Sequence, residues 1–158
     1  MTHDPHDAKV SLGHLRRQRR LNRARLRSLS CHIVDTACCG AGGDLPLSGR
    51  AGQVRSVAPE QADVLVIAGS VTAGLAHEVR ALYDRMPHPK WVVAVGACAC
   101  DGGPFREYPN VAEGLRGIVP VDVWVPGCPP TAEAVEAGFV ELRERVQRRM
   151  EERIASRR

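Results

Sequence analysis

Ala62-Asp-Val-Leu-Val-Ile-Ala68 is the stretch that decides the fold class, because it is apolar at every position except Asp63. A run of this kind is typical of a strand that is buried on both faces of a parallel sheet. Shorter apolar runs at residues 29–34, 91–95 and 121–125 are predicted to be further strands. Parallel strands need long connections, which are usually helical, so helices are expected between them.

Two helices are predicted from their apolar spacing. The first follows the strand predicted at 62–68, and Pro87 and Pro89 end it. Its apolar residues are spaced i, i+4, i+7 and i+11: Leu75, Val79, Leu82 and Met86. The last helix has Thr131 as its expected N-cap and Glu133 in its first turn. Its apolar stripe consists of Val135, Phe139, Leu142, Val146 and Met150. With a weaker helix around residues 110–116, the alternation predicts an α/β domain with a mostly parallel sheet and helices on both faces.

The charges are unevenly distributed along the 158 residues. Residues 8–34 carry eight basic side chains and no acidic one, although the whole chain has a net charge of only +4. We therefore expect a basic, partly helical N-terminal extension (1–28), one globular domain (29–150) and a charged C-terminal tail (151–158). No aromatic residue lies among the arginines of the extension, so it lacks the stacking platform of a nucleic-acid-binding segment. Docking on a partner or on a membrane surface is the favoured interpretation.

The chain is expected to remain in the cytoplasm. Its longest apolar stretch, residues 64–76, is shorter than the roughly 20 residues that cross a bilayer, and the N-terminus has no apolar core of a signal peptide. The reducing cytoplasm disfavours disulfides, so the six cysteines need another explanation.

Most of the cysteines follow predicted strands. Cys38 and Cys39 come after the strand at 29–34, Cys98 and Cys100 lie in the expected loop 96–103 after the next-to-last strand, and Cys128 follows the last. Because the carboxyl ends of parallel strands meet at one edge of the sheet, these thiols are expected to converge there.

Four thiolates suit either a [4Fe–4S] cluster or a tetrahedral zinc ion. Structural zinc sites usually consist of two compact Cys-x₂₋₄-Cys knuckles, whereas the ligands here are spread from residue 38 to residue 128. This spacing favours the cluster and leaves zinc as the alternative. A flavin-binding module is a further alternative, but the glycine-rich segment 38–52 has no Ser/Thr-rich phosphate signature.

Four segments resemble one known superfamily in order and in motif. The segments are VDTACCGAG, ADVLVIAGSVT, VVAVGACACDGGPF and VPVDVWVPGCPPTAEAV, within residues 29–142. The superfamily contains the B subunit of NADH–quinone oxidoreductase and the small subunits of energy-converting [NiFe] hydrogenases, including formate hydrogenlyase. The resemblance implies a flavodoxin-like three-layer domain with one [4Fe–4S] cluster at the C-terminal ends of the strands.

The resemblance also assigns ligands. It implies that Cys38, Cys39, Cys98 and Cys128 bind the iron of the cluster. Cys100 lies two residues from Cys98 and is the less favoured substitute for it, because the motif matches Cys98. The sequence departs from both branches: the second cysteine of the hydrogenase branch falls on Gly42, and the acidic residue that usually follows the cysteine pair in the quinone-reductase branch is absent. The proton or quinone chemistry assigned to that acidic residue is therefore not carried over.

By this resemblance the chain is a non-catalytic electron-relay subunit of an oxidoreductase complex. The implied partners are a large catalytic subunit of the quinone-reductase or [NiFe] hydrogenase type, a ferredoxin-like iron–sulfur subunit and membrane-arm subunits. Through them the chain would lie peripherally on the inner face of the cell membrane.

The remaining polar residues receive structural interpretations. Cys31 is expected to pack in the core, and His32 is expected to point to the opposite face and to bond at a subunit contact. His77 and His88 are predicted to be surface residues, and Asp101 is predicted to form a turn.

Overall fold

The computed structural model describes residues 28–40 and 53–156 of the chain. The strands are β1 (Ser28–Thr36), β2 (Gln53–Ser56), β3 (Val64–Gly69), β4 (Trp91–Val95) and β5 (Val123–Val125). The α-helices are α2 (Ala73–Arg85), α3 (Ala97–Asp101) and α4 (Ala132–Ala155), and the short 3₁₀ turns are η2 (Pro59–Gln61) and η3 (Gly103–Phe105).

The five strands form one parallel sheet in the order β2-β1-β3-β4-β5. This is the strand order of flavodoxin-like doubly wound folds. The chain leaves β1 toward one edge of the sheet, to form β2, and afterwards continues from β3 toward the other edge. The point between β1 and β3, where the direction reverses, is where such folds bind ligands.

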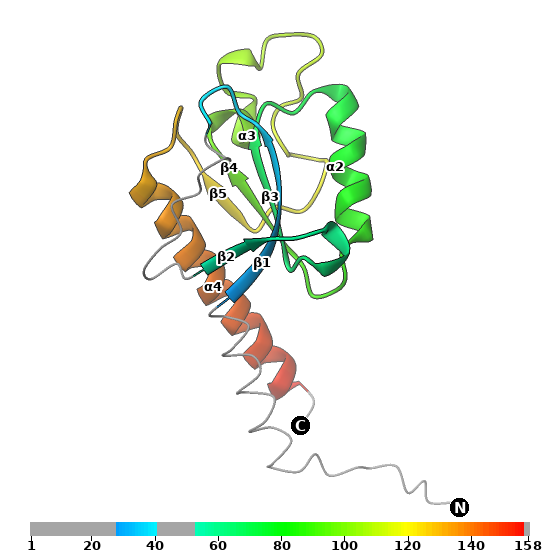
Figure 1. Ribbon diagram of the computed structural model, residues 1–158, viewed down its shortest axis with the longest axis vertical. Coiled ribbons are helices and arrows are strands. Elements are labelled where there is room, and N and C mark those ends of the chain that lie inside the picture. Colours follow the sequence, from blue (N-terminus) through cyan, green and yellow to red (C-terminus); the bar gives the residue numbers. More distant parts are fainter. Residues whose placement is uncertain (1–27, 41–52, 157–158) are drawn as a thin grey trace, which may run out of the picture.

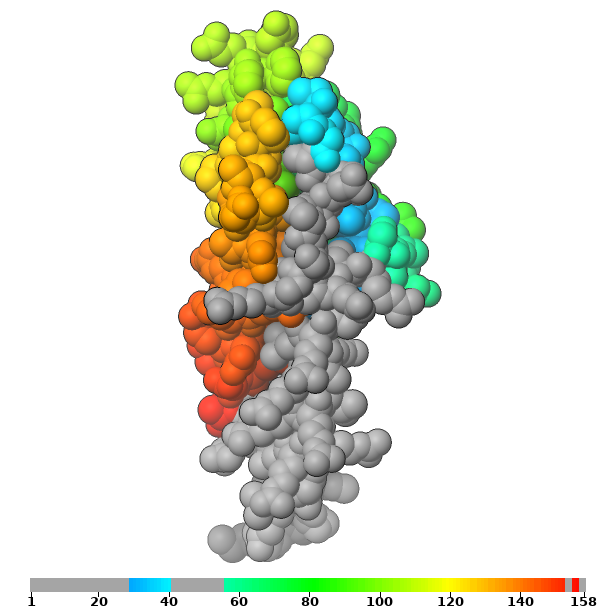
Figure 2. Space-filling view, turned by 60° about the vertical axis from the view of Figure 1, so that its left-hand side comes forward, coloured from blue at the N-terminus to red at the C-terminus, as the bar shows by residue number. Residues whose placement is uncertain are grey.

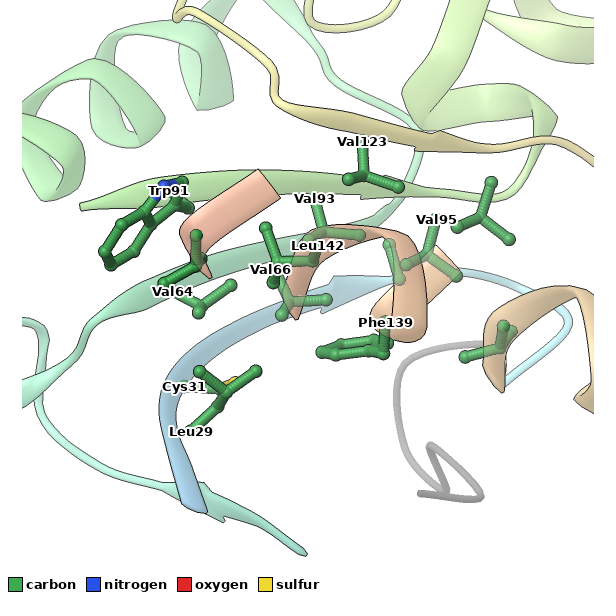
Figure 3. Close-up of a cluster of buried hydrophobic side chains, with 14 residues drawn as sticks. Leu29, Cys31, Val64, Val66, Trp91, Val93, Val95, Val123, Phe139 and Leu142 are labelled. Atoms are coloured by element: carbon green, nitrogen blue, oxygen red, sulfur yellow. The ribbon is translucent and has the colours of Figure 1, made fainter. Parts of the chain in front are cut away.

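Helices cover both faces of the sheet, as Figure 1 shows for α4 on one side and α2 on the other. Every residue of β3 and of β4 is buried, so alternate side chains of these strands enter two separate cores. One core packs against α4 and contains the buried Phe139 and Leu142 (Figure 3). The other packs against α2 and α3 and contains the buried Val79 and Leu115. The predicted α/β class with a helical layer on each face is confirmed.

Most of the predicted elements are present, and the stripe of the last helix is confirmed. β4 has the predicted bounds, β1 and β3 lie within two residues of theirs, and β5 keeps only the last three residues of its predicted run. The first four residues of the α4 stripe are buried and Met150 packs against the same core.

Two expectations were wrong, and one strand was missed. Residues 110–116 form turns instead of a helix, residues 96–103 include the helix α3 instead of a loop, and β2 was not predicted at all. β2 has only four residues at the sheet edge, too few to produce a readable alternation. The predicted helix in the basic extension lies outside the described residues. α4 continues through Ala155, into the segment expected to be the C-terminal tail.

Thr131 caps α4 as predicted, since its Oγ1 accepts a hydrogen bond from the backbone N–H of Ala134 at 3.2 Å. We expect Thr131→Ala to lower the free energy of unfolding by about 1 kcal/mol, because this N–H then loses its acceptor. Urea denaturation measures the change. Thr131→Ser keeps the hydroxyl and is the matched control; equal losses in the two variants would show that the cap contributes nothing.

Candidate metal centre

A single pocket at the carboxyl end of the sheet brings together the four predicted ligands. Cys38 and Cys39 reach it from the turn after β1, Cys98 from α3 and Cys128 from the loop after β5. Cys38, Cys39 and Cys128 are exposed, and Cys98 is partly buried. Figure 2 shows the segments after β1 (cyan) and after β5 (gold) at the same end of the molecule. The predicted convergence of these thiols is therefore present in the structure.

The turn that carries Cys38 and Cys39 is held against the end of β3. The Thr36 hydroxyl donates to the carbonyl oxygens of Ala68 and Ser70, at 3.2 and 2.9 Å. Gly69 allows this close approach, because a Cβ there would lie 2.3 Å from the backbone of Thr36 and of Ala37. Only glycine fits at position 69, which also has a positive φ of 99°.

The loop that carries Cys128 is bonded to the start of α3. The Gly96 N–H donates to the Val125 carbonyl at 2.7 Å, and the Ala97 N–H donates to the Gly127 carbonyl at 2.8 Å. These two bonds fix the backbone before Cys98 to the backbone before Cys128. The separation of the two backbone segments is therefore set by hydrogen bonds.

Several residues that line the pocket were not identified from the sequence, and two of them have side chains that bear on the site. Thr36 and Phe105 both line it, and Phe105 is 38% exposed at its rim. Phe105 lies within the segment GACACDGGPF, so its motif was visible even though its role was not. The Thr36 hydroxyl gave no sequence signal, because its acceptors are backbone carbonyls more than 30 residues away.

Cys100 lies outside the pocket. Its side chain turns toward the core between the sheet and α2, and its sulfur lies 4.0 Å from the Ala94 carbonyl oxygen. Burial, and then the negative charge of Asp101, raise the pKa of the Cys100 thiol to about 11. A thiol in this position disfavours the thiolate form that binds metal.

Cys31 is fully buried among the side chains that pack against α4, as predicted (Figure 3). Burial, followed by the nearby carboxylate of Asp63, raises the pKa of its thiol to about 12. Cys31 is therefore a neutral core residue.

The histidines and Asp101 have structural roles. His32 makes a hydrogen bond inside the chain, from Nδ1 to the Val57 carbonyl oxygen at 2.9 Å. Its expected bond at a subunit contact stays a prediction. His77 and His88 are exposed as predicted, and Asp101 accepts the Gly103 N–H at 2.9 Å, which forms the predicted turn.

The raised pKa of Cys31 predicts a pH dependence. Below about pH 9 the thiol is protonated in both the folded and the unfolded chain; above it, only the unfolded chain loses the proton until the folded pKa of about 12 is approached. The free energy of unfolding therefore falls as the pH rises through this range, by at most about 1.4 kcal/mol per pH unit from this group. We expect Cys31→Ala to have a shallower decline than the wild type in urea melts above about pH 9. Parallel declines would contradict the assignment.

The donor set fits a cubane iron–sulfur cluster. Four thiols line the pocket, and its described lining contains no carboxylate or imidazole. Among residues 28–40 and 53–156, no three His, Cys, Asp or Glu side chains are close enough together to chelate one metal ion. A cubane is wider than a single ion and takes one thiolate at each iron, so it does not require that spacing.

Comparison with known proteins identifies the family. Residues 23–142 match the family described as NADH ubiquinone oxidoreductase, 20 Kd subunit. The chain belongs to this family. Among its relatives, the NADH-quinone oxidoreductase B 2 subunit of Symbiobacterium thermophilum is 44% identical over 117 residues, or 74% of this chain and 63% of that protein. The NADH-quinone oxidoreductase B subunit of Heliobacterium modesticaldum is 41% identical over 120 residues, 75% of this chain and 67% of that protein. This chain thus spans about two thirds of the length of these relatives.

Solved structures share the fold. A chain of the membrane-bound sulfane sulfur reductase, an archaeal respiratory membrane complex, superimposes with a TM-score of 0.68 at 31% identity, covering 81% of this chain and 75% of that one. The Ni-Fe-Se hydrogenase of Desulfomicrobium baculatum superimposes with a TM-score of 0.52 at 17% identity, covering 67% of this chain and 58% of that one. This likeness shows the shared fold alone. Within the described residues, no helix has the length and apolar character needed to span a bilayer.

Proposed function

We propose that this chain is an electron-transfer subunit that holds one [4Fe–4S] cluster through Cys38, Cys39, Cys98 and Cys128. The observation that supports this most strongly is the pocket in which these four thiols meet, although they are up to 90 residues apart in sequence. When bound, such a cluster exchanges one electron at a time, at a potential set by its surroundings. No bond of a substrate is made or broken on this chain.

The protein's own contribution is to hold the thiolates and to limit the freedom of the backbone around them. Parallel strands fix where each ligand segment begins, and the backbone bonds between the Cys98 and Cys128 segments fix their separation. Gly103 lies close to the Cys98 sulfur, since a Cβ there would be 3.1 Å from it. Glycine at this position therefore leaves the sulfur free to face the pocket.

The exposure of three of the thiols supports a partner protein at this end. A cluster bound by Cys38, Cys39 and Cys128 would be open to water on the side where these residues are exposed. Phe105 lines the pocket and is 38% exposed, and its ring centroid lies 6.2 Å from that of Tyr108, which is 63% exposed. Exposed aromatic side chains of this kind are enriched in protein interfaces.

The proposed partner at this face is a large catalytic subunit of the quinone-reductase or [NiFe] hydrogenase type. A ferredoxin-like iron–sulfur subunit would supply or accept the electrons, and membrane-arm subunits would hold the complex at the inner face of the cell membrane. The family assignment and the likeness to a subunit of a respiratory membrane complex support these partners.

Absorption spectroscopy of the anaerobically purified chain tests the proposal. The expected sample is brown, with a broad visible band that bleaches on addition of dithionite. A colourless sample that contains zinc would support the structural zinc site instead, and two resolved visible bands would indicate a flavin. Either of these outcomes would overturn the proposal.

A further inference from the structure

The short helix α3, which carries Cys98, needs support from outside itself. It has only five residues, Ala97–Asp101, and an isolated helix of this length is unstable in water. Its first turn is bonded to the segment before Cys128, through the Ala97 N–H and the Gly127 carbonyl. Its other end must be held by a different part of the chain.

A turn that follows η3 packs directly on that end. The Leu115 N–H donates to the Ala99 carbonyl at 3.0 Å. Gly114, with a positive φ of 64°, lies so close to α3 that an added Cβ would be 2.5–2.7 Å from three of its backbone atoms. Those atoms are Ala99 O, Cys100 C and Asp101 N.

This turn is itself fixed to the rest of the domain. The Ala112 N–H donates to the Val71 carbonyl at 2.8 Å, and the Ala73 N–H donates to the Asn110 carbonyl at 3.0 Å. Leu115 is fully buried in the core beneath α2. A side chain at position 114 would therefore push α3 away, since the turn has two backbone bonds and a buried leucine holding it in place.

We propose that Gly114 is a positioning residue for Cys98: the absence of a side chain there sets how far α3, and with it the Cys98 sulfur, stands from the other three thiols. The effect of Gly114 on the geometry of the cluster rests on the proposed function, because it requires a bound cluster. The effect of Gly114 on the position of α3 does not depend on that function. Gly114 lies outside the pocket lining.

Gly114→Ala tests the proposal, and the chain offers a matched control. Gly117 also has a positive φ, 76°, but an added Cβ there would meet nothing within 4 Å. Gly117→Ala therefore introduces similar backbone strain without the contact on α3. The difference between the two variants isolates the effect of displacing the helix.

Two measurements on the full chain decide the outcome. In the anaerobically purified protein, we expect Gly114→Ala to shift the reduction potential and the EPR spectrum of the reduced cluster, or to lose most of the iron, while Gly117→Ala matches the wild type. In the metal-free protein, we expect the rate at which iodoacetamide alkylates Cys98 to differ several-fold between Gly114→Ala and Gly117→Ala, as followed by mass spectrometry of the Cys98 peptide. Equal values for both variants in both measurements would overturn the proposal.

The two hypotheses can fail separately. If the wild type bound no cluster, the proposed function would fall, and the alkylation rates would still decide the role of Gly114. If Gly114→Ala did not fold, hydrogen exchange of backbone amides in the wild type would serve as the test in place of this variant. The Leu115 N–H, bonded to α3, should then be more protected with the cluster than without it, whereas the Ile118 N–H, which bonds within the turn, should not change. Equal protection of Leu115 in both forms would contradict the role of this turn.

Discussion

Cys128→Ser is expected to lose most of the iron from the anaerobically purified chain. Cys128 is the proposed ligand from the loop after β5, and a serine hydroxyl is a poorer ligand than a thiolate for the iron of a cluster. The exposed position of Cys128 means that the substitution leaves the core untouched, so the loss should not come from unfolding. Iron and acid-labile sulfide analysis measure the change, and circular dichroism verifies the fold.

Cys100→Ser is the matched control for this experiment. It makes the same chemical change in a thiol that lies only two residues from Cys98 but outside the pocket. We expect this variant to retain the iron content of the wild type. If Cys100→Ser lost its iron while Cys98→Ser kept it, the ligand on α3 would be Cys100.

Phe139→Ala is expected to cause the largest loss of stability among single core substitutions in α4. Phe139 is fully buried in the α4 stripe, in the core cluster that includes side chains of β3 and β4 (Figure 3). Removing its ring leaves a cavity between the helix and the sheet, which costs about 3–5 kcal/mol. A stability of about 5–15 kcal/mol is typical of a domain, so the variant should lie close to unfolding.

Urea denaturation of Phe139→Ala and of Tyr108→Ala makes the comparison. Tyr108 is 63% exposed, so truncating it should change the free energy of unfolding by less than about 0.5 kcal/mol. A loss below about 1 kcal/mol for Phe139→Ala would contradict the packing of α4 on this face of the sheet.

The periodic parts of the fold were predictable from sequence, and the irregular parts were not. β3 and β4 are buried on both faces, so they appear in the sequence as continuous apolar runs. α4 is buried along one face, so its apolar residues recur with the helical period. α3 gave no such pattern, because its five residues span little more than one turn and glycines flank it on both sides. β2 is too short to show an alternation, and its place beside β1 follows from pairing with distant residues.

The convergence of the candidate ligands was predictable from the sequence, and the contacts that support them were not. Cysteines that follow successive parallel strands must converge, and the sequence shows which residues these are. The hydroxyl of Thr36, the missing side chain of Gly69 and the contact of Gly114 with α3 act between segments that are separate in sequence. Such contacts depend on the final packing of the chain and leave no local pattern.

Native mass spectrometry of the anaerobically purified full chain tests the central claim most directly. The account predicts one dominant species, whose mass exceeds that of the polypeptide by four iron and four sulfide ions. A polypeptide that carries a single zinc ion, a flavin, or no bound group at all would contradict it.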